Sequence, residues 1–183
     1  EKGIDCHFTA GGQYASIKYE DLLRYIPWVN SVVRFDGEIT ILELEECLVR
    51  SANWKKIQGV VYLENHRIFT NPLRPAEKDL DHFPFPVRAP LIEYALDKRF
   101  ATILAGRGCV HNCSFCNTNE YYRQMPGPTK RIRNPVMLVQ EMEWLFYEKD
   151  CSIFLFQDDD FPVKSVLEPD WITRFCGELE WKG

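Results

Sequence analysis

The fold of this chain is decided by the stretch Gly106-Arg107-Gly108-Cys109-Val110-His111-Asn112-Cys113-Ser114-Phe115-Cys116. Directly before it, residues 100–105 form an apolar run typical of a buried strand, so the cysteines lie on a loop that leaves the strand. Three thiolates on such a loop can hold three irons of a [4Fe–4S] cluster, and the fourth iron then has no protein ligand. A cluster that only transfers electrons normally has four cysteine ligands. The open iron predicts a site that performs chemistry, as an open position does at catalytic metals.

Two other interpretations of the loop stay open. The three thiolates and His111 could form a structural zinc site, which would make the chain a non-catalytic interaction module. Zinc sites generally gather their ligands as separated pairs, however, whereas His111 lies between Cys109 and Cys113. The other alternative is three cysteines without a metal, which a glycine-rich loop at the end of a strand does not favour.

The loop resembles the cluster motif of radical S-adenosylmethionine (SAM) enzymes, including the aromatic Phe115 before the third cysteine. The order of the next elements supports this: a helix opening at Asn134-Pro135, a strand over 152–156 and an acidic turn at 157–161. The resemblance implies an α/β fold in which residues 99–183 form the first βα units of a radical SAM barrel. It also implies that the open iron binds SAM, which is cleaved reductively to methionine and a 5′-deoxyadenosyl radical.

The same resemblance implies roles for residues around the cluster. Small residues would let the loop wrap the cluster, Phe115 would shield it, and an acidic residue of the turn would contact the SAM amino group. The basic segment 130–133 would bind the SAM carboxylate or an acidic substrate. The simpler alternatives are a tight turn for the glycines, a core position for Phe115 and solvated turns for the two charged segments. The metal ligands implied are Cys109, Cys113 and Cys116, and the surrounding residues are Gly106, Arg107, Gly108, Phe115, Arg133, Asp158 and Asp159.

Residues 1–70 resemble the C-terminal part of a cobalamin-binding domain. Gly11-Gly12 is similar to the glycine pair beside the nucleotide tail of cobalamin, and the alternation of short strands and helices fits a parallel, Rossmann-like sheet. We expect a helix with a capping box at Thr40 and Glu43, and a hairpin over 60–69. The Asp-x-His-x-x-Gly cobalt-ligand motif of the family is absent, because Asp5-Cys6-His7 does not match it.

Residues 71–98 are predicted to connect the two parts. This segment is rich in proline and includes Phe83-Pro84-Phe85-Pro86, so it cannot form a regular helix or a central strand. We expect a semi-rigid connector whose aromatic side chains dock on a neighbouring surface.

Composition limits the remaining classes. The chain has 183 residues with 45% hydrophobic residues, which suits a globular protein, and its net charge of −5 gives no general footprint for nucleic acid. No apolar run is long enough to span a bilayer, and we expect no secretory leader. Seven cysteines, three of them clustered, argue against a disulfide framework and for a reducing, cytoplasmic setting. Because the chain opens on Glu1, we expect a fragment of something longer.

The predicted function is therefore that of a cobalamin-dependent radical SAM enzyme. The resemblance implies methyl transfer through cobalamin, or a related ring closure or rearrangement, on a small-molecule substrate with an external electron donor such as flavodoxin or ferredoxin. The alternative within the superfamily is an enzyme with a degenerate cobalamin domain, such as a methylthiotransferase-like protein. That group normally has three further grouped cysteines, which this chain lacks.

Overall fold

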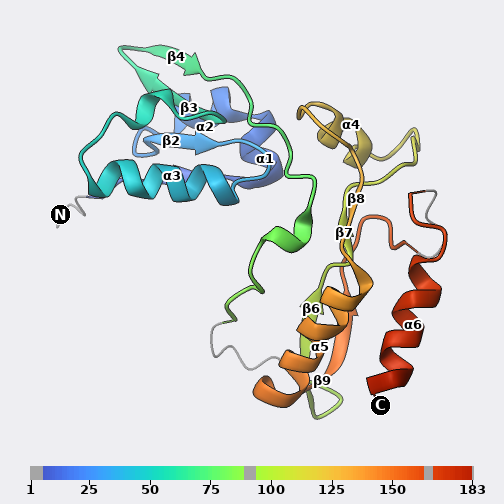
Figure 1. Cartoon of the computed structure of the whole chain (residues 1–183). Coiled ribbons are helices and arrows are strands. Elements are labelled where there is room, and N and C mark those ends of the chain that lie inside the picture. The colour runs from blue at the N-terminus through green and yellow to red at the C-terminus, as the bar shows by residue number, and fades with distance from the viewer. Residues whose placement is uncertain (1–5, 89–93, 163–166, 183) are drawn as a thin grey trace. The chain divides into compact units, whose positions relative to one another are not determined.

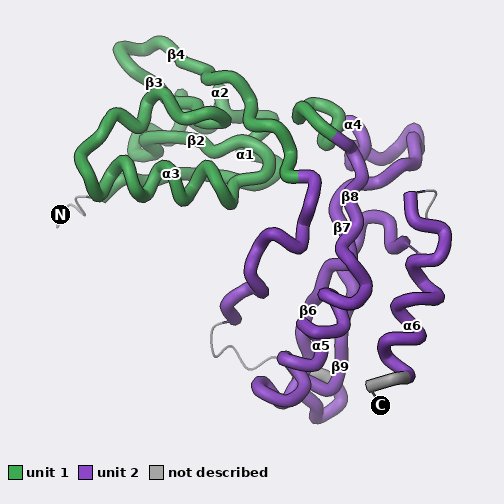
Figure 2. The backbone as a smooth tube through the Cα atoms, viewed as in Figure 1, with its two compact units in different colours: residues 1–77, 121–127 green, residues 78–120, 128–183 purple. Residues whose placement is uncertain are grey.

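The chain is a mixed α/β structure, described by a computed structural model for residues 6–88, 94–162 and 167–182 (Figure 1). It divides into two compact units (Figure 2). Unit 1 comprises residues 1–77 and 121–127, and unit 2 comprises residues 78–120 and 128–183. No helix in the described ranges has the length and apolar character needed to cross a membrane.

Unit 1 is a four-stranded sheet with helices on both faces. Its strands, in the order in which they pair, are β1 (Thr9–Ala10), β2 (Ser31–Val33), β3 (Val60–Glu64) and β4 (Arg67–Thr70). Successive strand residues point to opposite faces. Val32 therefore packs with residues of α1 (Gly12–Ile17) and α2 (Tyr19–Tyr25), whereas Val33 packs against α3 (Glu38–Val49). A short 3-10 helix, η1 (Trp54–Lys56), precedes β3.

The sheet of unit 1 is mixed rather than parallel throughout. β1 and β2 pair in parallel as predicted, but β2–β3 and β3–β4 are antiparallel. The predicted hairpin accounts for the second of these pairs, because β3 and β4 are joined by the two residues Asn65 and His66, both with positive φ. A two-residue turn of this kind can connect only antiparallel neighbours.

The predicted capping box of α3 is wrong. The helix begins at Glu38, and its N-cap residue Gly37 makes no side-chain capping hydrogen bond. Thr40 instead donates a hydrogen bond to the carbonyl oxygen of Gln58 and accepts one from Arg74, and Glu43 forms an ion pair with Arg74 at 2.5 Å. Both side chains therefore hold Arg74 in the segment after β4, and Thr40 also holds the segment between η1 and β3, which local spacing alone does not reveal.

Unit 2 contains the parallel pair expected for the start of a barrel. β6 (Lys98–Ile103) and β9 (Cys151–Phe156) run parallel, and β5 (Tyr94–Ala95) pairs with β6 in antiparallel fashion. α5 (Pro135–Lys149) and α6 (Trp171–Lys182) pack against this sheet around Ile103, Leu138 and Trp171. The remaining elements are β7 (Gly106–Arg107), β8 (Arg131–Ile132), α4 (Thr118–Arg123) and the 3-10 helix η2 (Leu80–His82).

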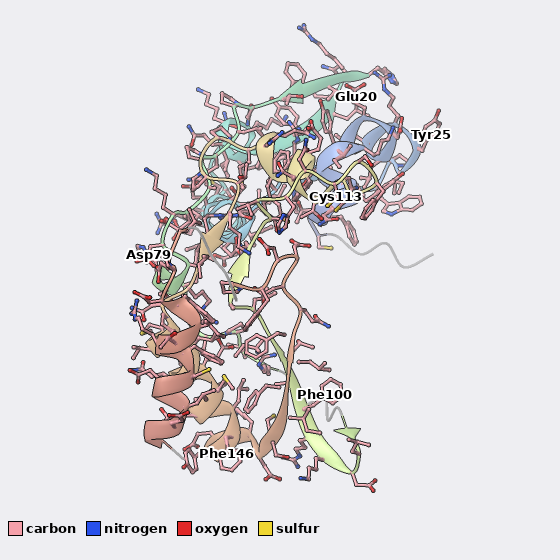
Figure 3. The ribbon with its side chains drawn as sticks, turned by 90° about the vertical axis from the view of Figure 1, so that its right-hand side faces the viewer. Glu20, Tyr25, Asp79, Phe100, Cys113 and Phe146 are labelled. Atoms are coloured by element: carbon pink, nitrogen blue, oxygen red, sulfur yellow. The ribbon has the colours of Figure 1, made fainter. Side chains whose placement is uncertain are left out.

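The helix boundaries of unit 2 follow the sequence closely. Asn134 caps α5 by accepting a hydrogen bond from the backbone N–H of Val136, and Pro135 occupies the first turn, as predicted. α6 begins at Trp171, whose indole N–H donates to the carbonyl oxygen of Arg133 at 2.7 Å. One face of β9 is only partly covered, because Leu155 is 46% exposed. Phe146 on α5, labelled together with Phe100 of β6 in Figure 3, is also half-exposed.

The proline-rich segment is fixed to unit 2 by ion pairs as well as by aromatic contacts. Glu141 of α5 is 1% exposed and pairs with Arg88 at 3.1 Å and with Arg133 at 2.5 Å. Arg133 also pairs with Asp81 of η2 at 3.3 Å. Phe85 lies 6.3 Å from Trp144, measured between ring centroids, which agrees with the expected docking of the aromatic side chains.

Candidate functional site

The cysteine loop begins where β7 pairs with β8 in antiparallel fashion, and the close approach of the two segments explains the glycines of the loop. A Cβ on Gly106 would lie 2.5 Å from the carbonyl oxygen of Arg131, and one on Gly108 would lie 1.8 Å from that of Thr129. Gly108 also has a φ of +82°, which favours glycine. The close approach of the segment before β8 therefore requires glycine at both positions, whatever the loop binds.

The three cysteines differ in exposure. Cys109 is buried, whereas Cys113 (Figure 3) and Cys116 are exposed. The backbone N–H of Cys116 donates to the carbonyl oxygen of Cys113 at 3.1 Å, which closes a turn between them. Hydrogen bonds from Thr118 lower the pKa of the Cys116 thiol, which favours the thiolate form that binds metals. The donor set and its turn geometry thus fit a cluster.

Hydrogen bonds also arrange the first half of the loop. The backbone N–H of His111 donates to Cys109 Sγ at 3.4 Å. The side chain of Asn119 in α4, which is 5% exposed, donates from Nδ2 to the carbonyl oxygens of Cys109 at 3.2 Å and His111 at 2.6 Å. Asn119 was not found from the sequence, where it reads as an ordinary polar residue after the third cysteine.

One group of side chains resembles a mononuclear metal site. Ligand atoms of Cys109, His111 and Asp160 lie within 4.8 Å of one another, and among the described residues this group includes only one of the three cysteines. Lys130 Nζ lies 3.6 Å from the carboxylate of Asp160, and its ammonium also donates to the Asp160 carbonyl oxygen. A buried ammonium at this distance opposes a divalent cation. The zinc interpretation, which needs all three thiolates with His111, is therefore not favoured by the geometry.

The acidic turn after β9 separates its three carboxylates. Asp158 accepts hydrogen bonds from the backbone N–H groups of Ala105 at 3.0 Å and Gly106 at 2.6 Å, so it ties the end of β9 to the start of β7. Burial raises the pKa of Asp158, and these two hydrogen bonds act in the opposite direction. Asp159 is exposed and close enough to Cys116 for its charge to raise the pKa of that thiol.

The basic segment is not a solvated turn, which corrects the simpler of the two interpretations. Lys130 is 6% exposed and Arg131 is 3% exposed. The guanidinium of Arg133 is held by Asp81, Glu141 and the carbonyl oxygen of Leu104. Because its charge is already compensated, Arg133 is placed to fix the connector rather than to bind a free carboxylate.

A cavity of about 310 Å³ lies beside the start of the cysteine loop in unit 2. Gly106, Arg107 and Gln157 line it together with residues of the proline-rich segment. The guanidinium of Arg107 stands 6.0 Å from the ring centroid of Phe83. Phe115 lies outside this cavity and is 90% exposed. The structure thus brings Gly106, Arg107 and Arg133 together here and places Phe115 elsewhere on the loop.

The glycine pair of unit 1 borders a second, open pocket of about 390 Å³. Phe35 also lines it and has a φ of 62°, with its backbone N–H donating to Ser16 Oγ at 2.7 Å. The ring of Phe35 packs against Tyr121, which follows the cysteine loop in sequence and belongs to unit 1. His7 contributes to packing, since it bonds to Ser31 and contacts the ring of Trp54. The lining residues are Gly11, Gly12, Val33, Phe35, Gly37, Glu38 and Ile41.

Comparison with solved structures identifies the class of fold. No family model matches the chain. The radical SAM methyltransferase TsrM from Kitasatospora setae, solved with cobalamin and a [4Fe–4S] cluster bound, superposes with a TM-score of 0.73 at 18% identity. The match covers 98% of this chain and 35% of TsrM. The chain therefore shares the fold of the matching third of TsrM.

Sequence comparison gives the relatives. An uncharacterised methyltransferase of Pyrococcus horikoshii is 30% identical over 171 residues, which is 92% of this chain and 36% of the relative. The anaerobic magnesium-protoporphyrin IX monomethyl ester cyclase of Rubrivivax gelatinosus is 28% identical over 188 residues, which is 98% of this chain and 32% of the relative. The sequence relatives are thus named as a methyltransferase and a cyclase, and the matching solved structure is named as a radical SAM methyltransferase with cobalamin and a [4Fe–4S] cluster bound, which confirms the resemblance seen in the cysteine loop. The chain spans about a third of the length of these relatives.

Proposed function

We propose that this chain carries the [4Fe–4S] cluster and the SAM site of a cobalamin-dependent radical SAM methyltransferase or cyclase. The observation that supports this most strongly is the set of three thiols on one loop beyond the C-terminal end of β6. In parallel α/β folds this is the end of the strand where ligands bind. The similarity to methyltransferases and a cyclase supports the reaction class.

The residues of the loop have distinct tasks in this proposal. Cys109, Cys113 and Cys116 hold three irons and leave the fourth for SAM. A bound cluster supplies the electron for reductive cleavage of SAM, while the protein orients the reactants and excludes side reactions. Asp159, exposed and close to Cys116, is the acidic residue placed to bind the SAM amino group. Asp158 has the different task of holding the two strand ends together.

The pocket beside Gly11 and Gly12 is the proposed site for the nucleotide tail of cobalamin. Its glycines leave room for close approach, since a Cβ on Gly12 would meet nothing within 4 Å. We further propose that residues 1–70 are the C-terminal part of a cobalamin-binding domain, with 71–98 as connector and 99–183 as the start of the barrel. The substrate is a small molecule, and reduction comes from an external donor such as flavodoxin or ferredoxin.

The test begins with the intact protein, purified without oxygen and reconstituted with iron and sulfide. We expect a broad absorbance band near ~400 nm and about four irons per chain. Alanine at Cys109, Cys113 or Cys116 is expected to abolish both. Cys176→Ala, which changes an exposed cysteine on α6, is the matched control and should leave them unchanged. A colourless protein with stoichiometric zinc would overturn the proposal and favour the structural zinc module.

A further inference from the structure

We propose that Asn119 is a positioning residue for the cysteine loop, and that it tunes the reduction potential of the cluster by fixing the hydrogen bond from His111 to Cys109. This inference rests on the proposed function, because it concerns the cluster that the loop would bind. It follows from three contacts that converge on the segment 109–111.

The first contacts are those of the Asn119 amide. Its Nδ2 donates to the carbonyl oxygens of Cys109 and His111, two residues apart, and so fixes both ends of this short segment. Two carbonyl oxygens facing one atom require that atom to be the nitrogen, which settles the orientation of the amide. Asn119 Oδ1 is buried and accepts no hydrogen bond from the described residues, so the donors alone hold the side chain.

The third contact is the one that these hydrogen bonds position. With both carbonyl groups held, the backbone N–H of His111 points at Cys109 Sγ, at 3.4 Å. An N–H group directed at a ligand sulfur stabilises the extra negative charge of the reduced cluster, and such hydrogen bonds help to set cluster potentials. Asn119 contacts no ligand sulfur itself and would act only through this backbone segment.

Burial makes the arrangement stiff. Asn119 is 5% exposed and Cys109 is 8% exposed, so water does not readily replace the amide as a donor to the two carbonyl groups. The second and third cysteines are exposed and have no comparable contact to Asn119 among the described residues. Any effect of Asn119 should therefore concern the iron bound by Cys109.

The experiment compares Asn119→Ala and Asn119→Asp with the wild type in the intact protein, reconstituted without oxygen. Alanine removes both donors without adding charge, and aspartate keeps the shape while removing both donors. The exposed neighbour Asn117 provides matched controls, with Asn117→Ala for the truncation and Asn117→Asp for a charge added near the cluster. The readouts are iron content and the midpoint potential, measured by redox titration with electron paramagnetic resonance.

We expect both Asn119 variants to retain less iron and to show a lower midpoint potential than their Asn117 counterparts. A wild-type potential in Asn119→Ala at full iron content would overturn the inference while leaving the proposed function intact. If Asn119→Ala does not fold, the midpoint potential of the near-isosteric Asn119→Asp is compared with that of Asn117→Asp. Equal potentials at full iron content would then overturn the inference. Failure of the wild type itself to bind iron would instead count against the proposed function.

Discussion

The cysteine loop of unit 2 and the glycine pair of unit 1 use the same residue type in different surroundings. In the loop, a Cβ on Gly108 would lie 1.8 Å from a backbone oxygen of the chain itself. In unit 1, a Cβ on Gly11 would lie 3.5 Å from the carbonyl oxygen of Val33, and one on Gly12 would have no neighbour within 4 Å. Internal packing thus requires glycine at position 108, whereas Gly11 and Gly12 border an open pocket. Glycine-rich sequence alone does not distinguish these two reasons.

Charged groups show the same contrast. Around the loop, Glu141 and Lys130 are almost fully buried and each contacts a partner of opposite charge. In unit 1, the pair of Lys18 and Asp21 is more than half exposed on both sides, at 4.0 Å. Substitutions of the buried and of the exposed charged groups should therefore differ sharply in their effect on the free energy of unfolding, and the predictions below test this difference.

The largest effect is expected for Gly108→Ala. Its Cβ would meet the carbonyl oxygen of Thr129, and backbone cannot move aside as a flexible side chain can. We expect a loss of stability above about 4 kcal/mol and loss of cluster binding, measured by urea unfolding and iron content. Gly12→Ala is the matched control, since its φ of +88° is close to the +82° of Gly108 but nothing lies near its Cβ. The control should lower the free energy of unfolding by only about 1–2 kcal/mol. Equal losses in the two variants would show that the close approach of the segment around Thr129 is not what requires glycine at position 108.

A smaller effect is expected for Glu141→Gln. This change leaves Arg88 and Arg133 without the carboxylate that both contact. We expect a loss of about 3 kcal/mol, toward the lower end for breaking a buried pair, because Arg133 keeps Asp81. Asp21→Asn in the exposed pair should change stability by less than about 0.5 kcal/mol. Urea unfolding of both variants checks this. Similar losses of unfolding free energy would contradict the contrast between the buried and the exposed charged groups.

Features that depend on neighbouring residues could be predicted from the sequence, whereas contacts between distant segments could not. The cap at Asn134 and the hairpin over 60–69 depend on residues close in sequence, so local rules predicted them. The buried ion pairs of Glu141 could not be predicted, because its partners Arg88 and Arg133 come from different segments and only the fold brings them together. The capping box at Thr40 failed for the same reason, since Arg74 lies 34 residues away in sequence.

The candidate site divides along the same line. The order along the chain was enough to predict that the three cysteines share one loop after a strand and that an acidic turn follows β9, whereas their role in binding a cluster and SAM stays a prediction. The separate tasks of Asp158 and Asp159 were not, because adjacent carboxylates look equivalent until one of them meets the backbone N–H groups of Ala105 and Gly106. Lys130 likewise reads as a surface residue, and only its burial beside Asp160 shows otherwise.

Asp158→Asn should have a moderate, pH-dependent effect. Asparagine offers one acceptor where the carboxylate serves two N–H donors, so we expect a loss of about 1 kcal/mol near neutral pH. Because burial raises the folded-state pKa of Asp158, the folded chain holds this proton more tightly than the unfolded chain does. The resulting stabilisation is present below the unfolded pKa and is lost as the pH rises through the folded pKa. The advantage of the wild type over Asp158→Asn should therefore be larger at pH ~4 than at pH ~7.

Urea unfolding across this pH range measures the effect, and Asp159→Asn is the control. Asp159 is exposed and adjacent, so the same loss of charge should leave stability nearly unchanged. An advantage of the wild type over Asp158→Asn that grew with pH would contradict the assignment. It would mean that the hydrogen bonds from Ala105 and Gly106 outweigh burial in setting the pKa of Asp158.

The smallest effect on stability is expected for Gly11→Ala, and here binding rather than folding is informative. Gly11 has an extended backbone, with a φ of −149° that any residue adopts, and its new Cβ would make only an ordinary contact with the carbonyl oxygen of Val33. The free energy of unfolding should change by less than about 0.5 kcal/mol. If the pocket receives the nucleotide tail of cobalamin, the methyl group occupies part of the space that the ligand needs. Absorbance titration of the intact protein with hydroxocobalamin should then give several-fold weaker binding, and unchanged affinity would place the cobalamin site away from this glycine pair.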